Sequence, residues 1–399
     1  MVTNKRSEDY YPPIEFPQLL VKPVNAMNVV DQNLRLFLKN SFNKDLLKIG
    51  HLLWLMLCFA ATANAQQEPQ YTNYLFNTLA YNPAYAGSKG YLSVRALHRD
   101  QWYDWGGVSG PSGYDGRPVT QTFTAHTGLG DRIGVGISFI NDRIGAKGST
   151  GLDLSYAYRV DFGQGIIALG LQGGIINWRA DWDELDFKDP QQIDNSFNEG
   201  NPNLWIPNFG AGIYYYNENF YAGISVPRLT GIRLRDNVDE SVIRRWAQIY
   251  QHFYLTLGGT IPLKGDNIIF KPSLLIKSVG LFADFLRQGD SFRTVGAPTS
   301  FDVNASFLLH QKLWLGASFR SAFEAFRRKQ NDITNTNVSS HASADVLLGY
   351  QMAQGLRIGV AYDFPLSAIN NYSTGSIEVM LGWDFVRKID KIVTPRYFF

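Results

Sequence analysis

Long apolar runs are scarce in this chain of 399 residues. Beyond residue 65, no run approaches the roughly 20 apolar residues that a helix needs to cross a bilayer. Cysteine is almost absent too, since Cys58 is the single one. Cys58 lies in a segment that we expect to be removed, which leaves no thiol for disulfides, nucleophilic catalysis or a cysteine-based metal site.

An excess of charge of either sign is also lacking. The chain has 37 basic and 35 acidic residues, and seven of the basic and five of the acidic ones precede Gln66. The part from Gln66 onward is therefore balanced, without the basic stripe that nucleic-acid binding requires. The motifs H-E-x-x-H, G-x-S-x-G and G-x-x-x-x-G-K-[ST] are absent, and the histidines are scattered singly. These features predict a protein that is not an enzyme and needs no cofactor or metal.

The N-terminal region has the pattern of an export signal. Lys44 and Lys48 precede an apolar stretch at residues 52–61, and Ala63-Asn64-Ala65 forms a small-residue cleavage site. We therefore predict a signal peptide at residues 44–65, cleaved near Ala65. Residues 1–43 are polar and interrupted by proline, and they are either a misassigned start or a functional extension.

The pattern of the remaining chain is that of β-strands, which residues 342–385 show most clearly. Apolar residues alternate with small or polar ones over residues 342–352, 356–364 and 377–385, which is the period of a strand. A soluble sandwich alternates in the same way. Strands of about nine to eleven residues nevertheless favour a membrane barrel, because a tilted strand needs that length to cross a bilayer. The charged residues fall on the face opposite the apolar one: Arg357, Asp363, Glu378 and Asp384.

Fourteen such segments lie between residues 91 and 385, joined by alternately long and short links. We predict an all-β fold, an antiparallel transmembrane β-barrel of about 14 strands, with long extracellular loops and short periplasmic turns. One expected loop is residues 141–150. The even strand count places both termini on the periplasmic side. Residues 66–90 then form a periplasmic N-terminal segment that packs into the barrel mouth or contacts a partner. Residues 386–399 form a periplasmic tail that binds a partner or folds back.

The expected lumen carries charges of both signs. They form either a polar conduit or docking surface, or a paired interior that props the wall; mixed signs in a narrow lumen favour pairing. Bulky inward residues argue against a wide pore, and Gly134 and Gly136 are expected to be small lumen-facing residues. The inward charges are Asp153, Arg159, Asp302, Arg320, Asp345, Arg357, Asp363, Glu378 and Asp384, and the bulky residues are Tyr214, Tyr216, Tyr221 and Trp314.

Several motifs resemble one known family. The runs Gln70-Tyr71-Thr72-Asn73-Tyr74-Leu75-Phe76-Asn77 and Asn82-Pro83-Ala84-Tyr85-Ala86-Gly87 are similar to the mature N-terminus of the PorP/SprF family of Bacteroidota outer-membrane proteins. Residues 220–227, 271–277, 313–320, 361–365 and 395–398 resemble it as well. Ile377, where the family pattern leads us to expect histidine, and the N-terminal extension are departures.

The resemblance implies a non-catalytic outer-membrane barrel of the type IX secretion and gliding system. Such a protein supports export or surface anchoring of secreted substrates such as large adhesins. Its expected partners are outer-membrane lipid, periplasmic components of the secretion machinery and a large secreted surface protein, with no nucleic acid. A porin or small-solute channel is the alternative. The partner-binding candidates are Asn82, Pro83, Tyr85, Arg99, Gln101, Trp102, Arg396 and Tyr397.

Overall fold

The computed structural model describes residues 69–104, 116–184, 201–229, 251–279, 299–322 and 342–385. The predictions for residues 1–68, including the signal peptide and its cleavage near Ala65, lie outside these ranges, as does the tail at residues 386–399. In the described ranges, no helix has the length and apolar character needed to cross a membrane.

The described strands form one antiparallel sheet of fifteen members. Their bounds are β1 (Leu92–Asp100), β2 (Val119–Leu129), β3 (Ile133–Ile144), β4 (Lys147–Phe162), β5 (Gly165–Ala180), β6 (Asn203–Tyr216), β7 (Phe220–Val226), β8 (His252–Gly259), β9 (Ile261–Pro262), β10 (Ile268–Val279), β11 (Ser300–Leu309), β12 (Leu313–Ala322), β13 (Ser343–Gln351), β14 (Leu356–Pro365) and β15 (Ser376–Phe385).

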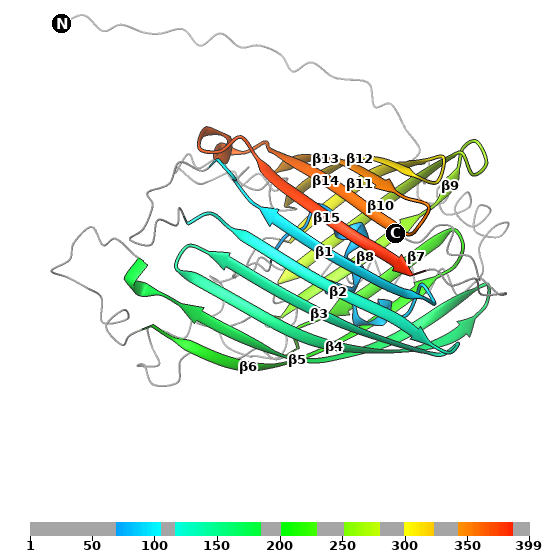
Figure 1. Ribbon diagram of the computed structural model, residues 1–399, viewed down its shortest axis with the longest axis horizontal. Helices are drawn as coiled ribbons and strands as arrows, with labels where there is room; N and C mark the ends of the chain where they lie inside the picture. Colours follow the sequence, from blue (N-terminus) through cyan, green and yellow to red (C-terminus); the bar gives the residue numbers. More distant parts are fainter. Residues whose placement is uncertain are drawn as a thin grey trace, which may run out of the picture. The chain divides into compact units, whose positions relative to one another are not determined.

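The sheet closes on itself. Strand β1 pairs with β15 over nine residues, and β10 pairs with β11, so each end of the sheet meets a partner. The two-residue β9 pairs only with β10, which leaves fourteen strands around the ring, as the sequence predicted. Figure 1 shows these strands tilted across the barrel. Closure gives each of the fourteen strands of the ring two hydrogen-bonded neighbours, which is how a sheet satisfies its backbone groups in lipid.

The two faces of the wall differ as the alternation predicted. In β15, Glu378 and Asp384 are buried, while Val379, Leu381 and Trp383 are 39–51% exposed. An apolar outer face with a polar inner face is the arrangement of a membrane barrel.

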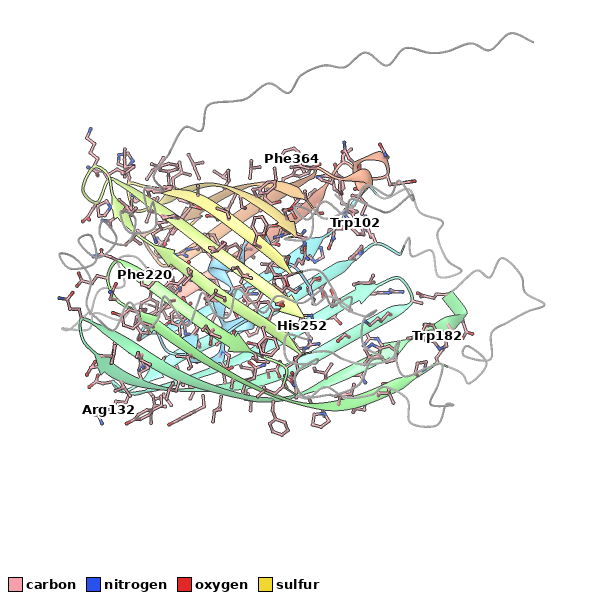
Figure 2. All side chains as sticks on the ribbon, turned by 180° about the vertical axis from the view of Figure 1, so that it is seen from behind. Trp102, Arg132, Trp182, Phe220, His252 and Phe364 are labelled. Carbon is pink, nitrogen blue, oxygen red and sulfur yellow. The ribbon has the colours of Figure 1, made fainter. Side chains whose placement is uncertain are left out.

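The two rims of the barrel are distinguished by their links. Figure 2 shows Trp102 and Trp182 at one rim and Arg132 and Phe220 at the other. We call the first the loop end, because most long links leave from it. The second is the turn end, where most of the short links lie and where β1 begins and β15 ends.

One predicted loop is wrong. Strand β3 continues to Ile144 and β4 starts at Lys147, so only Gly145 and Ala146 join them, and Gly145 adopts a φ of 55°. The many polar residues at 141–150 favour a loop. Apart from the turn at Gly145 and Ala146 they form strand instead, with the Thr150 hydroxyl donating to Asn141 Oδ1 at 2.9 Å. Strands β4 and β5 consequently reach 16 residues each.

The chain before β1 lies within the barrel. It forms three short 3-10 turns, η1 (Tyr74–Phe76), η2 (Thr78–Ala80) and η3 (Pro83–Tyr85). The Asn82 side chain caps η3 by accepting from the Ala84 amide at 3.0 Å, with proline at the first helical position. In both views this blue ribbon appears behind the strands nearest the viewer (Figures 1 and 2). We call residues 71–89 the enclosed segment.

Burial of the enclosed segment is deeper than the sequence predicted. Residues 71–79 and 81–89 are all buried, including polar Thr72, Asn73 and Asn77 at 1% exposure or less. We expect from the sequence a periplasmic segment that packs into the barrel mouth or contacts a partner. Its residues fill the lumen instead, because its polar groups find partners on the inner wall.

Candidate functional site

The enclosed segment is held at the loop end by backbone contacts to charged wall residues. The amides of Thr72 and Asn73 donate to the two carboxylate oxygens of Glu378 at 2.8 and 2.7 Å. Arg99 joins the same group, donating to the Thr72 hydroxyl at 2.7 Å and pairing with Glu378 and Asp363. Each of these three wall residues lies within three positions of the loop end of its strand, so the segment starts there.

The middle of the segment is held by short polar side chains and by aromatic packing. Asn77 donates to Thr122 and accepts from Thr124, both at 3.1 Å and both on β2. The Tyr74 hydroxyl lies 2.8 Å from the Ser273 hydroxyl on β10. Phe76 packs edge-on against Trp314 of β12, with ring centroids 5.2 Å apart. The segment thus touches opposite parts of the wall at once.

The last part of the segment lies at the turn end. The Gly87 amide donates to Nδ1 of His126 at 3.2 Å, and Arg159 donates to the Gly87 carbonyl at 2.6 Å. Lys89 pairs with Asp384 at 3.4 Å. The segment therefore crosses the lumen from the loop end to the turn end. This differs from our expectation that both chain ends leave on the turn side, because Pro69 precedes the contacts at the loop end.

The wall of β3, β5 and β6 is shaped to the segment by glycine. A Cβ on Gly170 would overlap the backbone of Ala84, and one on Gly134 would overlap the backbone of Ala86. A Cβ on Gly212 would overlap the side chain of Asn82. Glycine inside a strand commonly marks the close approach of another backbone, as here. The prediction that Gly134 faces the lumen is confirmed.

Aromatic side chains fill the space beside these glycines. Tyr214, Tyr216, Tyr221 and Trp314 are buried at 1–9% exposure, as predicted from their inward positions. Tyr85 of the segment meets Tyr214 edge-on with centroids 5.4 Å apart. Edge-on pairs of this kind add about 1 kcal/mol beyond burial of area. The inner wall is thus packed against the segment.

Most of the inward charges pair, as the mixed signs indicated. Arg320 binds Asp302 with a 2.5 Å contact between Nε and Oδ1, and Arg95 binds Asp384 at 2.7 Å. What the sequence reasoning missed is their second role. Arg320, Arg159 and Glu378 also bind backbone atoms of the enclosed segment. Hydrogen bonds to charged groups are stronger than neutral ones, so these contacts fix the register of the segment.

The predicted partner-binding residues fall into three groups. Asn82, Pro83, Tyr85 and Arg99 are buried in the lumen, where the structure gathers them around the segment and not on an exposed surface. Gln101 and Trp102 follow β1 at the loop end and are partly exposed, with the Trp102 amide donating to Ser376 at 3.2 Å. Arg396 and Tyr397 lie outside the described residues.

Together, the closed sheet, the apolar outer face and the polar inner face define an outer-membrane type of β-barrel, here filled by its own N-terminal segment. The family model described as "Type IX secretion system membrane protein PorP/SprF" matches residues 63–383. The chain belongs to this family, and the family and the fold support an outer-membrane location.

Solved structures similar to this chain include outer-membrane barrels with low sequence identity. Omp33 of Acinetobacter baumannii is 8% identical, with a TM-score of 0.38 over 75% of this chain and 100% of that chain. A TodX monoaromatic hydrocarbon channel mutant is 10% identical, with a TM-score of 0.40 over 78% of this chain and 94% of that chain. No protein with a curated description matches this chain.

Proposed function

We propose that this protein serves type IX secretion as a filled, non-catalytic barrel that binds partners and does not conduct solutes. It would support the export or surface anchoring of secreted substrates such as large adhesins. The family membership supports the link to secretion. The observation that carries the choice of binding over conduction is the enclosed segment, which is buried along its length inside the lumen.

The partner surfaces of this proposal lie at the two rims. Gln101 and Trp102 at the loop end are the partner-binding candidates that are partly exposed in the described residues. The short turns present the opposite rim to the periplasmic machinery. Four buried candidates would act indirectly, by holding the segment that closes the barrel: Asn82, Pro83, Tyr85 and Arg99. Two further candidates for contact with a periplasmic component are Arg396 and Tyr397.

An affinity pulldown tests the proposal. The tag is placed in the exposed turn at residues 264–266, and the protein is recovered from gently solubilised outer membrane. Recovery of periplasmic secretion components or of one large surface protein is the expected result. A variant with both Gln101 and Trp102 changed to alanine should lose a loop-end partner while keeping periplasmic ones.

The porin alternative is tested by conductance of the same purified protein in a planar bilayer. The filled lumen leads us to expect no steady conductance. Stable open channels, combined with recovery of the barrel alone in the pulldown, would overturn the proposal in favour of a solute channel.

A further inference from the structure

Strand β6 is longer than its neighbour β7. It pairs with β5 over all of its fourteen residues, but with β7 only over residues 211–216. Strand β7 ends at Val226, and the proline that follows has no amide to extend the ladder. Residues 203–210 therefore extend past β7. They do so at the loop end, where the Trp182 amide donates to the Asn201 side chain at 2.7 Å (Figure 2).

The hydrogen bonds around β6 show which of its residues face the side that β7 leaves open. The Pro202 carbonyl accepts from the Ala180 amide of β5 at 3.0 Å, whereas the Phe209 carbonyl accepts from the Leu229 amide on the opposite side at 2.7 Å. Backbone groups alternate between the two sides of a strand. Even-numbered residues of β6 therefore bond toward β5, and odd-numbered ones direct their amide and carbonyl groups away from it.

Asn203 and Trp205 are the odd-numbered residues at the start of β6. In the part of the chain that the structure describes, no backbone hydrogen bond reaches either of them from the open side. Pro207, the next odd-numbered residue, has no amide. Proline inside a sheet is confined to positions where its nitrogen faces an unpaired edge. Its place in β6 is thus a second indication that this side is an edge, and it limits the edge on the membrane side.

The edge lies where the outer face changes from apolar to polar. Phe209 and Ile213 are more than half exposed on this face, and Trp205, above them, is 66% exposed. The next outward residue is Asn203, whose side chain accepts from Asn177 at 2.6 Å. Lipid offers no hydrogen-bonding groups to backbone atoms at such a boundary. An open strand edge is instead a template that another extended chain can join.

We propose that this edge binds an extended segment of an exported polypeptide, which adds to the sheet as a short strand antiparallel to β6 and in line with β7. The backbone groups of Asn203 and Trp205 pair with its backbone, and the indole packs against an apolar side chain of the added strand. Affinity from main-chain hydrogen bonds suits a barrel that handles secreted substrates. The inference rests on the proposed function, because it states how a loop-end partner is held.

The first test places the photo-crosslinking residue p-benzoylphenylalanine at Trp205 of the full-length protein in its own cells. The control position is Leu171, which is 64% exposed on the outer face but has β4 and β6 paired on its two sides. We expect position 205 to crosslink to the surface protein that the pulldown recovers, and position 171 to crosslink to none. A crosslink within the chain, a crosslink between two copies or no protein crosslink at position 205 would overturn the proposal.

The second test compares Trp205→Pro with Trp205→Phe in the same pulldown. The proline removes the amide on the open side and spares the hydrogen bonds to β5, while phenylalanine keeps both the amide and an aromatic ring. Recovery of the surface protein should fall about tenfold in Trp205→Pro, as expected for one lost hydrogen bond, and stay unchanged in Trp205→Phe. Full recovery with Trp205→Pro would refute strand addition while the secretion role stands. No surface protein with the wild type would refute both.

Hydrogen exchange of the wild type keeps the proposal testable if Trp205→Pro fails to fold. The complex is measured as recovered and again after the surface protein has been removed. The Trp205 amide should be protected in the complex and lose that protection in the free barrel. The Leu204 amide, which bonds toward β5, should be protected in both. Equal exchange of the Trp205 amide in the two samples would contradict the added strand.

Discussion

Strands β3, β5 and β6 meet the enclosed segment with glycines, whereas β1, β14 and β15 meet it with charged side chains. On the first side, Gly134 and Gly170 let the backbone of the segment lie directly against the wall. On the second, Glu378 and Arg99 bind it through directional, charge-assisted hydrogen bonds. The glycine side matches the shape of the segment, and the charged side fixes its register. Both sides are needed to hold the segment in place.

The difference explains how a polar segment stays buried. Shape alone would leave the amides of Thr72 and Asn73 without acceptors, at a cost of about 1–3 kcal/mol each. Charges alone would leave gaps between the segment and the inner wall, and the atoms that line a gap lose van der Waals contacts. The predictions that follow test first the path of the segment and then each side of the lumen.

The largest expected effect concerns the path itself. A cysteine at Pro69, just before the enclosed segment, should be labelled by a membrane-impermeant maleimide in intact cells, because it lies at the loop end. A cysteine at Lys264 in a short turn should not be labelled until the outer membrane is opened. The background is low because Cys58 is the only native cysteine. If only the cysteine at position 264 were labelled in intact cells, either the path of the segment or the orientation of the barrel would be opposite to the one described.

The charged side is tested by Glu378→Gln. The change removes the carboxylate that binds two amides and Arg99, and breaking a buried pair in this way costs about 3–5 kcal/mol. We expect an earlier urea midpoint in lipid vesicles and faster proteolysis of the segment. Glu218→Gln, in an exposed turn, is the matched control and should leave both unchanged. An unaltered urea midpoint in Glu378→Gln would mean that the charged side contributes little to the stability of the barrel.

The fold was predictable from the sequence because its main signal is local. Alternation along each strand gave the fourteen strands and the inner and outer faces, which depend on neighbours within a few residues. Strand ends were harder to predict, since the polar residues 141–150 pair with each other in a way that composition does not show.

The site was not predictable in the same way. Its contacts join residues far apart, such as Thr72 and Glu378, which are separated by 306 positions. The segment has no strand period, and its asparagines and aromatics suit either a partner surface or an interior. One signal was present: Gly134, Gly170 and Gly212 leave the inner face without side chains, and such a wall has to be filled by something else.

The glycine side is tested by Gly170→Val. The added side chain would overlap the Ala84 backbone, so the segment has to shift, and we expect a loss of about 1–3 kcal/mol in unfolding free energy. Gly173→Val is the control on the same strand, because nothing lies within 4 Å of a Cβ added there. Equal midpoints for the two variants would show that the segment does not rest on this wall.

The smallest expected effect concerns neither the glycine side nor the charged side of the lumen, but the links at the loop end. Asp104 accepts hydrogen bonds from the Ser373 hydroxyl at 2.5 Å and from the Thr374 amide at 3.0 Å. These bonds, from Ser373 first, lower the pKa of Asp104 from 3.8 to about 2. A lowered pKa means that the contact is fully present above about pH 4 and is lost as the pH falls through 2.

Hydrogen exchange at the Thr374 amide measures this contact. Protection should be complete above about pH 4, decline as the pH approaches 2, and be reduced at every pH in Asp104→Ala. The exchange of the Thr72 and Asn73 amides should not follow this change, because Glu378 and not Asp104 accepts their hydrogen bonds. Parallel loss of protection at all three amides would instead show that the loop-end links and the enclosed segment open together, so that a partner binding the links could release the segment.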